Sequence, residues 1–522
     1  MNANQAKRIV ERRHPLYSAN VEHWRFLDAT YQGGRSWFES NVFRYHKEGD
    51  KEYTARIKRA YRFNHTREVV DIVNKHLFRT SIVRSDGAPN CLKEFWKNST
   101  LLGVDIDGFA KIMSLRSSIE GMPWVLVDNN YSLPPNASEA DRKQSKGRVF
   151  AKIIQSQDAL DWRYDEDGNL DWFLYREFIR DDLDPMKSSG DMVERLKLWT
   201  KTQWISVQPK YGTDKSLVSA TTKTGDHDLG AVPIVPVRNS FSHDPYYTPS
   251  LVADVAYLDR SVANYASNLD VIIQDQTFSQ LAIPAQGILP GDSAHSSMVE
   301  AAHNRIFIYD GEGGAIPHFL SPDPRQAQLI IEAIRQLINE IYHSVGLAGE
   351  RTKQDNAKGI DNSSGVAKQK DFERVLALLT AKAESVEYAE NKIAELVCKW
   401  NGVPVPEDQK LVAYSTDFSV RDLWDEMEIA LSLSLLSLPI EVLGEHKKEL
   451  VRKLFPGLTP SKIKELEKIV ESYEPPAAQE IAAQAGESSK AANRIVEEAK
   501  RSRDMAGQKQ SKTKARETDA KD

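Results

Sequence analysis

The sequence holds few groups of residues whose types and spacing could support catalysis or metal binding. Residues 165–172, DEDGNLDW, resemble a calcium-binding loop, but Gly168 stands at the fourth position instead of the sixth and no glutamate occupies the twelfth. An Asp-Gly pair between aromatic-rich segments is typical of a β-hairpin turn, so we expect one at Asp167-Gly168. A second acidic cluster, DDLDP at 181–185, has no histidine or lysine partner at a fixed spacing. We interpret that cluster as a solvated loop.

Motifs for nucleotide, zinc or covalent chemistry are missing from the sequence. It contains no GxxxxGK[ST] phosphate loop, no HExxH motif, no Cys/His cluster with zinc spacing and no GxSxG nucleophile elbow. His343 is expected to be structural or exposed. We therefore predict a protein that is not an enzyme and that uses no metal and no cofactor. The alternative from another class is a hydrolase or nuclease that uses the carboxylates of residues 165–184.

Composition limits the class of protein further. The 522 residues carry a formal net charge of −6, which argues against a general nucleic-acid coat, since such proteins are normally basic. Two cysteines, Cys91 and Cys398, exclude a disulfide framework and favour a reducing compartment. The N-terminus lacks the apolar region of a signal peptide, and the most apolar run, 429–440, is too short to span a bilayer. We expect a soluble chain that is not inserted in a membrane.

Strands and helices alternate in blocks along the chain. Helices are predicted at 15–31, 64–78 and about 104–120, followed by a β-rich region from 120 to 240. Its aromatic residues are expected to pack in a core, because no RNA-binding consensus surrounds them; they are Trp162, Trp172, Phe173 and Tyr175.

Long helices dominate the second half of the sequence. An apolar stripe with spacings of three and four predicts a helix of about 30 residues over 250–282. Residues 283–322 are rich in proline and glycine and contain one clear strand, RIFIYDG. Further helices are predicted at 323–345 and 366–400, and then at 420–438, 440–454 and 460–473.

The order of these elements resembles the portal proteins of tailed bacteriophages. A G-x-[IV]-P strand followed by an asparagine precedes the first stem helix in that family, and a serine-glycine-hydrophobic-alanine sequence opens its long backbone helix. Both marks occur here, as Gly230, Val232, Pro233, Ile234 and Asn239, and as Ser364, Gly365, Val366 and Ala367. The resemblance covers roughly residues 10 to 475.

The resemblance implies a mixed α+β subunit of a ring, typically of 12 copies, at one capsid vertex. Its expected parts are a helical and β-rich wing (1–249), a first stem helix (250–282), a clip (283–322), a second stem helix (323–345), a tunnel loop (346–365), the backbone helix with the rest of the wing (366–440), a helical crown (441–475) and a charged, partly disordered tail (476–522). Another ring-forming connector or scaffold component of the virion is the nearest alternative.

The resemblance also implies a function and a set of partners. The ring would carry double-stranded DNA during packaging, retention and ejection. It would bind the terminase large subunit, a head–tail adaptor, and the major capsid and scaffolding proteins. The expected location is the virion, reached by assembly in the host cytoplasm.

Charge distribution suggests which residues would face the DNA. The two stem segments carry net charges of −3 and −1, which would make an anionic passage that repels phosphates. Its candidate lining residues are Asp270, Asp275, Glu332 and Glu340. The loop 346–365 is polar, with three cations and three anions, and interrupts two strong helices. Its candidate DNA contacts, expected to be weak and sliding, are Arg351, Lys353, Asn356 and Lys358.

Overall fold

The computed structural model describes the chain as two units, Met1–Ser419 and Val420–Asp522. The residues described are 3–80, 82–130, 147–182, 184–212, 217–277, 280–284, 306–309, 316–320, 323–347, 365–404, 410–416, 418, 448, 451 and 460–471. The fold is mixed α+β, as predicted.

Short helices begin the first unit. They are α1 (Ala3–Glu11), α2 (Pro15–Gln32), α3 (Arg35–Asn41), α4 (Asp50–Arg59), α5 (His65–Leu77), α6 (Asn90–Lys97) and α7 (Ile106–Glu120). Side-chain caps fix the start of α2, α5 and α7: His14 accepts from the Leu16 amide at 3.2 Å, Asn64 from the Arg67 amide at 2.9 Å, and Asp105 from the Gly108 amide at 2.8 Å. The three helices predicted in this region are confirmed as α2, α5 and α7, whereas α1, α3, α4 and α6 were not predicted.

Two antiparallel sheets form the β-rich region, as predicted. Five strands follow one another in chain order: β4 (Ala159–Tyr164), β5 (Leu170–Arg180), β6 (Met192–Thr200), β7 (Gln203–Tyr211) and β8 (Leu217–Asp226). A second sheet has the order β3-β2-β9, from β2 (Trp124–Asn129), β3 (Val149–Ile154) and β9 (Ile234–Pro236). A short ladder joins β1 (Val83–Arg84) to β13 (Val412–Ala413). A single 3-10 turn, η1 (Ser156–Asp158), precedes β4.

The predicted hairpin turn at Asp167-Gly168 is confirmed. Gly168 has a φ of +77°, a conformation that glycine adopts without steric cost. The Asp165 carboxylate accepts from the Asp167 amide at 3.1 Å and from the Asn169 amide at 2.8 Å. This carboxylate therefore stabilises the turn, and the calcium-loop likeness has a structural explanation.

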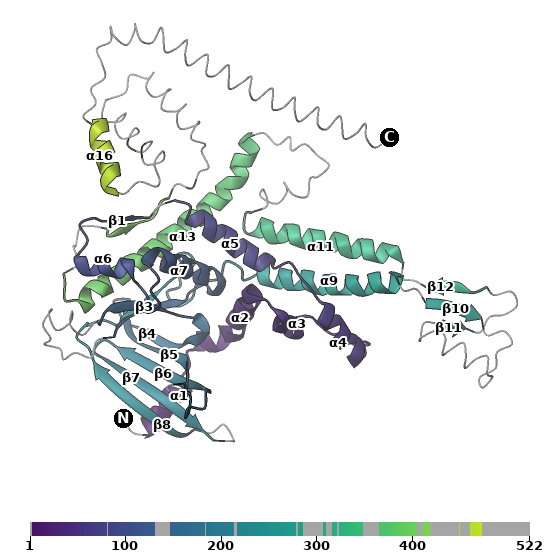
Figure 1. The fold of residues 1–522 in the computed structure, drawn as a ribbon, viewed down its shortest axis with the longest axis horizontal. Coiled ribbons are helices and arrows are strands. Elements are labelled where there is room, and N and C mark those ends of the chain that lie inside the picture. The colour runs from purple at the N-terminus through teal and green to yellow at the C-terminus, as the bar shows by residue number, and fades with distance from the viewer. Residues whose placement is uncertain are drawn as a thin grey trace, which may run out of the picture. The chain divides into compact units, whose positions relative to one another are not determined.

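Two long helices lie side by side and lead to a small sheet (Figure 1). They are α9 (Val255–Thr277) and α11 (Pro324–Ser344); the sheet joins β10 (Gln280–Pro284) to β11 (Ile306–Tyr309) and β12 (His318–Leu320). The predicted helix over 250–282 is therefore too long. Residues 280–282 belong to β10, because all three pair with β12, and Leu281 and Ala282 also pair with β11.

The longest helix, α13 (Gly365–Trp400), is confirmed over its predicted range. At 1.5 Å per residue its 36 residues span about 54 Å. Apolar residues along it are buried in the main core, among them Leu379, Val386, Ile393 and Val397. Its last residue, Trp400, donates from Nε1 to the Val127 carbonyl of β2 at 2.8 Å. The helix thus connects the helical core to the sheets.

The second unit contributes α16 (Pro460–Glu471), in agreement with the helix predicted over 460–473. The predicted helices 420–438 and 440–454 lie outside the described residues except for 448 and 451, and the tail 476–522 lies outside them entirely. So do residues 348–364 of the predicted tunnel loop, with Arg351, Lys353, Asn356 and Lys358. None of the described helices has the length and apolar character needed to cross a bilayer.

Candidate functional site: the α9–α11 helix pair and its polar anchor

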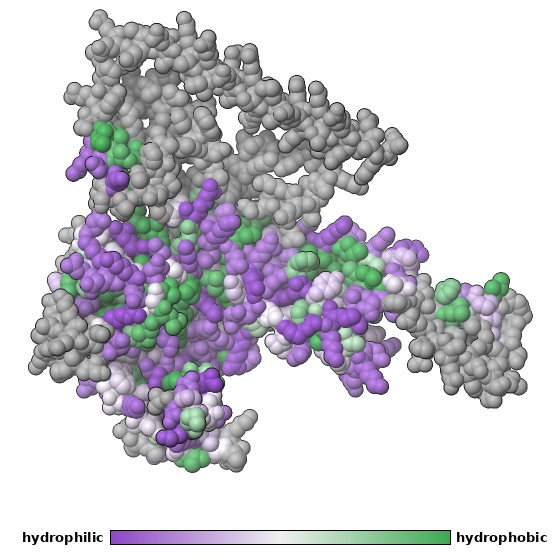
Figure 2. All heavy atoms as spheres, in the orientation of Figure 1, coloured by the Kyte–Doolittle hydropathy of each residue, from purple (hydrophilic) through white to green (hydrophobic). Residues whose placement is uncertain are grey.

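The α9–α11 pair has a proximal half, residues 255–270 and 333–345, and a distal half, residues 271–277 and 324–332. In the proximal half Val255, Val262, Ile341 and Val345 are buried in the main core. In the distal half apolar side chains remain exposed, with exposed fractions of 68% for Leu329 and 48% for Ile273. Figure 2 shows such side chains gathered over α11 and the small sheet.

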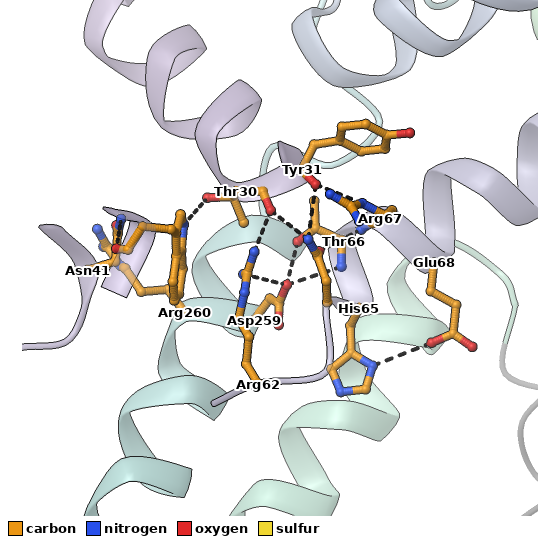
Figure 3. Close-up of polar contacts among 12 residues, drawn as sticks. Thr30, Tyr31, Asn41, Arg62, His65, Thr66, Arg67, Glu68, Asp259 and Arg260 are labelled. Atoms are coloured by element: carbon orange, nitrogen blue, oxygen red, sulfur yellow. Dashed lines mark hydrogen bonds and ion pairs between the residues drawn. The ribbon is translucent and has the colours of Figure 1, made fainter. Parts of the chain in front are cut away.

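The proximal half is anchored by a buried ion pair (Figure 3). Asp259 is fully buried, and its Oδ2 accepts from Arg62 Nη1 at 3.0 Å, from the Thr66 amide at 3.1 Å and from Thr66 Oγ1 at 2.8 Å. The Arg62 guanidinium lies 3.7 Å from the centre of the Trp37 ring. Burial lowers the pKa of Arg62, while the nearby Asp259 opposes this shift. Because both charges are removed from water, each depends on the other for stabilisation.

Residues next to this ion pair also donate hydrogen bonds to the last carbonyl groups of α2. Helix α2 stops at Gly33, whose φ of +66° ends the helical turn. Asn64 Nδ2 donates to the carbonyls of Thr30 and Tyr31, each at 3.0 Å, and Arg67 Nε donates to Tyr31 O at 3.0 Å. The segment between α4 and α5 therefore ties the C-terminus of α2 to α9.

A second layer of polar contacts lies about two to three turns further along α9. Arg56, only 3% exposed, binds both carboxylate oxygens of Glu48, at 2.8 and 2.6 Å, and donates to Ser267 Oγ at 3.1 Å. Its hydrogen bond to Glu48 is the main cause of the lowered pKa of that carboxyl. Arg59 forms a more exposed pair with Asp270 at 3.1 Å.

The polar partners on α9 share one face. Asp259, Ser267 and Asp270 are separated by eight and three residues, which places them on neighbouring positions of the same side of the helix. Asn264 adds contacts to α3, because its Nδ2 donates to Asn41 O at 2.9 Å and its Oδ1 accepts from the Phe43 amide at 2.8 Å. Helix α9 is thus held by α11 through apolar contacts and by the α3–α5 region through polar ones.

The structure places the predicted stem residues in two different environments. Asp275, Glu332 and Glu340 are exposed. Asp270 is compensated within the chain by Arg59, and Asp259, which contributed to the charge count, is compensated by Arg62. Since two of the acidic charges are paired with arginines outside the stem segments, the net charge of −4 for the two segments falls to −2 per copy.

The remaining predicted groups are separated in space. The acids of 165–171 lie beside Lys201 at one end of β5, where Asp165 is 2.8 Å from its Nζ. Asp181, Asp182 and Asp184 follow the other end of that strand. Within the described residues no group of three or more histidine, cysteine, aspartate or glutamate side chains is placed to hold a metal. His343 is exposed, as expected.

The packing role predicted for the hairpin aromatics is confirmed in most cases. Trp162, Phe173 and Tyr175 are at most 3% exposed and belong to one apolar cluster. Trp172 is partly buried and lies under the Arg12 guanidinium, 4.5 Å from its ring centre. Of the cysteines, Cys398 is buried and Cys91 is partly exposed.

Asn239, one of the residues that carry the family resemblance, has a structural contact. Its Oδ1 accepts from Lys382 Nζ at 2.9 Å, and the same ammonium donates to Ser117 Oγ at 3.0 Å. Lys382 is 1% exposed, and burial lowers its pKa to about 7. The segment after β9 is in this way joined to α7 and α13.

Sequence reasoning missed the arginines of the anchor. The segment ARIKRAYRFNHT, residues 55–66, supplies Arg56, Arg59 and Arg62 to α9. The available signal was Asp259 itself, a carboxylate between the apolar stripe residues Leu258 and Val262. A buried acid in such a position requires a cation from elsewhere in the chain.

Comparison with known proteins gives distant structural likenesses. No protein-family model matches the sequence, and no curated protein does so. Chains from three structures of gene transfer agent (GTA) particles align with this chain. The neck of an empty particle computed with C6 symmetry aligns over 72% of this chain and 87% of its own, with a TM-score of 0.38 and 11% identity.

The other two structures align to a similar extent. A chain of the native GTA virion covers 81% of this chain and 97% of its own, with a TM-score of 0.37 and 10% identity. A chain of the native neck computed with C12 symmetry covers 77% and 89%, with a TM-score of 0.33 and 11% identity. TM-scores below 0.5 do not establish a common fold, so function is inferred below from the residues and contacts of the chain itself.

Proposed function

We propose that the protein is a portal protein, one subunit of a ring that forms a DNA channel at a capsid vertex of a tailed phage or phage-like particle. The observation that carries this proposal is the α9–α11 pair. A helix leaves a β-rich and helical body, a small three-stranded sheet follows, and a second helix returns to the body beside the first. The long α13 then follows, in the order expected for wing, stem, clip, stem and backbone helix.

The dimensions and anchoring of the pair suit the wall of a channel. Its helices have 23 and 21 residues, so each is about 32–35 Å long. Only the proximal half is fixed within the subunit, through Asp259, Arg56 and the apolar core. In a ring, here expected to hold 12 copies, the exposed distal halves would pack against those of neighbouring subunits.

The residual charge suits passage rather than binding of DNA. In the described part of α9 and α11, four exposed charged residues form no ion pair. Three of them are negative (Asp275, Glu332 and Glu340) and one is positive (Arg335). Repeated around a ring, this excess would repel phosphates and reduce tight binding to the duplex. In the segment 346–365, the residues proposed to make weak contacts with the passing DNA are Arg351, Lys353, Asn356 and Lys358.

The small sheet is the proposed site for docking proteins. Ile316 and Phe319 are 76% and 70% exposed at and near β12, and such apolar groups at a strand edge favour contacts with a partner. We assign this end to the terminase large subunit and the head–tail adaptor. The major capsid and scaffolding proteins are the proposed partners of the rest of the ring. The ring would assemble in the host cytoplasm and become part of the virion.

Imaging of the purified full-length chain tests the proposal. Light scattering after size exclusion, followed by negative-stain microscopy, is expected to give rings with a central hole, built from 58.9-kDa subunits. A chain that stays monomeric across salt, crowding and scaffold conditions would overturn the portal assignment. Metal-dependent DNA cleavage that is lost in Asp181→Ala or Asp184→Ala would instead support the hydrolase alternative.

A further inference from the structure

A groove lies where the linker between α1 and α2 crosses β4 and β5. It encloses about 490 Å³, and its lining includes Arg12, Arg13, Arg163, Trp162, Trp172 and Tyr246. The linker is held in place by a backbone hydrogen bond of 2.8 Å from His14 N to Leu160 O. Three arginines, several aromatic rings and two carboxylates, Asp161 and Asp244, therefore line one open site that the DNA-channel proposal does not use.

The aromatic wall of the groove is built around His14. Its ring stacks on Trp162 at 4.4 Å and on Tyr246 at 5.8 Å between centroids. Its Nδ1 accepts from the Leu16 amide at 3.2 Å, which leaves the proton of the neutral ring on Nε2. Trp162 is 3% exposed, and its Nε1 has no hydrogen-bond partner among the described residues. The neutral His14 ring can therefore donate from Nε2, whereas the buried Trp162 Nε1 is closed to a partner from outside.

The three arginines of the groove differ in the contacts that they already make within the chain. Arg12 pairs with the nearly buried Asp161 and stacks on Trp172. Arg163 is 66% exposed along its side chain, and within the described part of the chain it makes only a long ion pair, 3.9 Å to Asp171. Arg13 is exposed and donates from Nη1 to carbonyls at the end of α1. Arg13 and Arg163 thus present charge to solvent on either side of the groove.

A complementary surface lies on the loop that joins β5 to β6. Asp181 and Asp182 are exposed, while Asp184 caps the turn by accepting from the Met186 amide at 3.0 Å. Residues 180–191 carry four aspartates against one arginine and one lysine, a net charge of −2. Met186 is 89% exposed and Phe178, near the end of β5, is 52% exposed. The loop therefore combines carboxylates with apolar side chains.

The groove and the loop occupy opposite ends of one strand. Trp172 stands near the start of β5 and Asp181 directly follows its end, so the two sites are separated by about 30 Å of extended chain. Trp172 and Asp181 therefore cannot meet within one copy. Two complementary surfaces at different places on one subunit can produce head-to-tail contacts, which close into a ring when the rotation between copies permits.

We propose that the groove of one copy binds the 181–191 loop of the next copy. Asp181 and Asp182 would pair with Arg13 and Arg163, since guanidinium–carboxylate pairs are strong and directional. Met186 would lie on the exposed part of the Trp172 ring, a contact that methionine sulfur favours. This inference rests on the proposed ring and names a contact between its subunits.

Charge reversal tests the contact. The groove variant Arg13→Glu with Arg163→Glu keeps the Arg12–Asp161 pair, and the loop variant Asp181→Arg with Asp182→Arg keeps the capping Asp184. Each variant alone is expected to need at least tenfold higher protein concentration for half-assembly, measured by light scattering. An equimolar mixture is expected to recover rings, because each loop then meets a groove of opposite charge. Such rings contain the two variants in alternation and hence an even number of copies.

A matched control separates this contact from an effect of net charge. Asp226→Arg with Asp228→Arg changes two exposed acids elsewhere, and assembly is expected to stay within twofold of the wild type. Circular dichroism and urea unfolding verify that every variant is folded. If the wild type forms rings and the loop variant assembles equally well, or if the mixture fails to recover rings, the contact is refuted while the portal proposal stands. A wild-type chain that forms no rings overturns both.

Discussion

The two halves of the α9–α11 pair are stabilised by different interactions. The proximal half is held by buried polar contacts to the α3–α5 region: Asp259 pairs with Arg62, and Ser267 accepts from Arg56, which pairs with Glu48. The distal half contains few such contacts and exposes Ile273, Leu329 and Ile331, the last at 37%. One half is completed within the subunit. The other half offers apolar surface that a neighbouring subunit would cover.

The largest expected effect comes from breaking the first polar layer. Arg62→Ala leaves Asp259 buried without its cation, so we expect the free energy of unfolding to fall by about 3–5 kcal/mol. Urea unfolding followed by tryptophan fluorescence measures the change. Arg67→Ala is the matched control, because Arg67 is exposed and donates only to carbonyls at the end of α2; a loss below about 1 kcal/mol is expected there. If the two variants lose the same free energy of unfolding, Asp259 is not stabilised by its ion pair with Arg62.

Arg56→Ala tests the second layer and is expected to cost about 2–3 kcal/mol, since it removes charge-assisted hydrogen bonds to Glu48 and Ser267. The pKa of Glu48 lies below its usual 4.5 in the folded state. The pair therefore adds stability above pH 4.5 that is lost as the pH falls through the lower, folded value. Unfolding between pH 3 and 6 should show a smaller acid-induced loss in the variant. An unchanged pH profile would contradict the role assigned to Arg56.

The distal half should respond in the opposite way. Leu329→Gln changes a side chain that is 68% exposed, so the free energy of unfolding of the isolated subunit is expected to change by less than about 0.5 kcal/mol. Ring assembly is expected to weaken, because the leucine would be covered by a neighbour. Leu337→Gln, at a partly buried position against the core, is the control and should destabilise the subunit itself. A large loss of subunit stability in Leu329→Gln would remove the distinction between the halves.

The smallest effect on folding is expected at the loop beyond α11. Replacing Arg351, Lys353 and Lys358 together by alanine should leave subunit stability and ring formation unchanged, while packaging or retention of DNA is impaired. Assembly is measured by light scattering, and DNA content by nuclease protection. If assembly fails instead, this segment makes subunit contacts and is not a DNA-facing loop.

Elements with local signals were predictable from the sequence. Helices α5 and α7 begin at the side chains that cap them, Asn64 and Asp105, and the β4–β5 turn follows from Asp167-Gly168. Helix α13 was predictable because its apolar residues recur with helical spacing over ten turns. In these cases the determining residues lie within a few positions of the feature.

Features that depend on distant partners were not predictable. Residues 280–282 were assigned to a helix because their strand character appears only when β11 and β12 pair with β10. The stem charge was overestimated because Arg59 and Arg62 lie about 200 residues before the aspartates that they neutralise. No periodicity within 250–282 indicates that Asp259 is buried.

The distance along the chain between Arg62 and Asp259 also has a consequence during synthesis. The two residues are 197 positions apart, so at about 5–20 residues per second the carboxylate is made roughly 10 to 40 s after the arginine. Until then α3, α4 and the start of α5 lack the partner that fixes them to the core, and Arg56 lacks Ser267. Ribosome-bound chains ending before residue 259 should therefore remain sensitive to protease between α2 and α5, and those extending well past residue 270 should not. Helix α9 would thus supply a partner that the N-terminal helices need in order to fold.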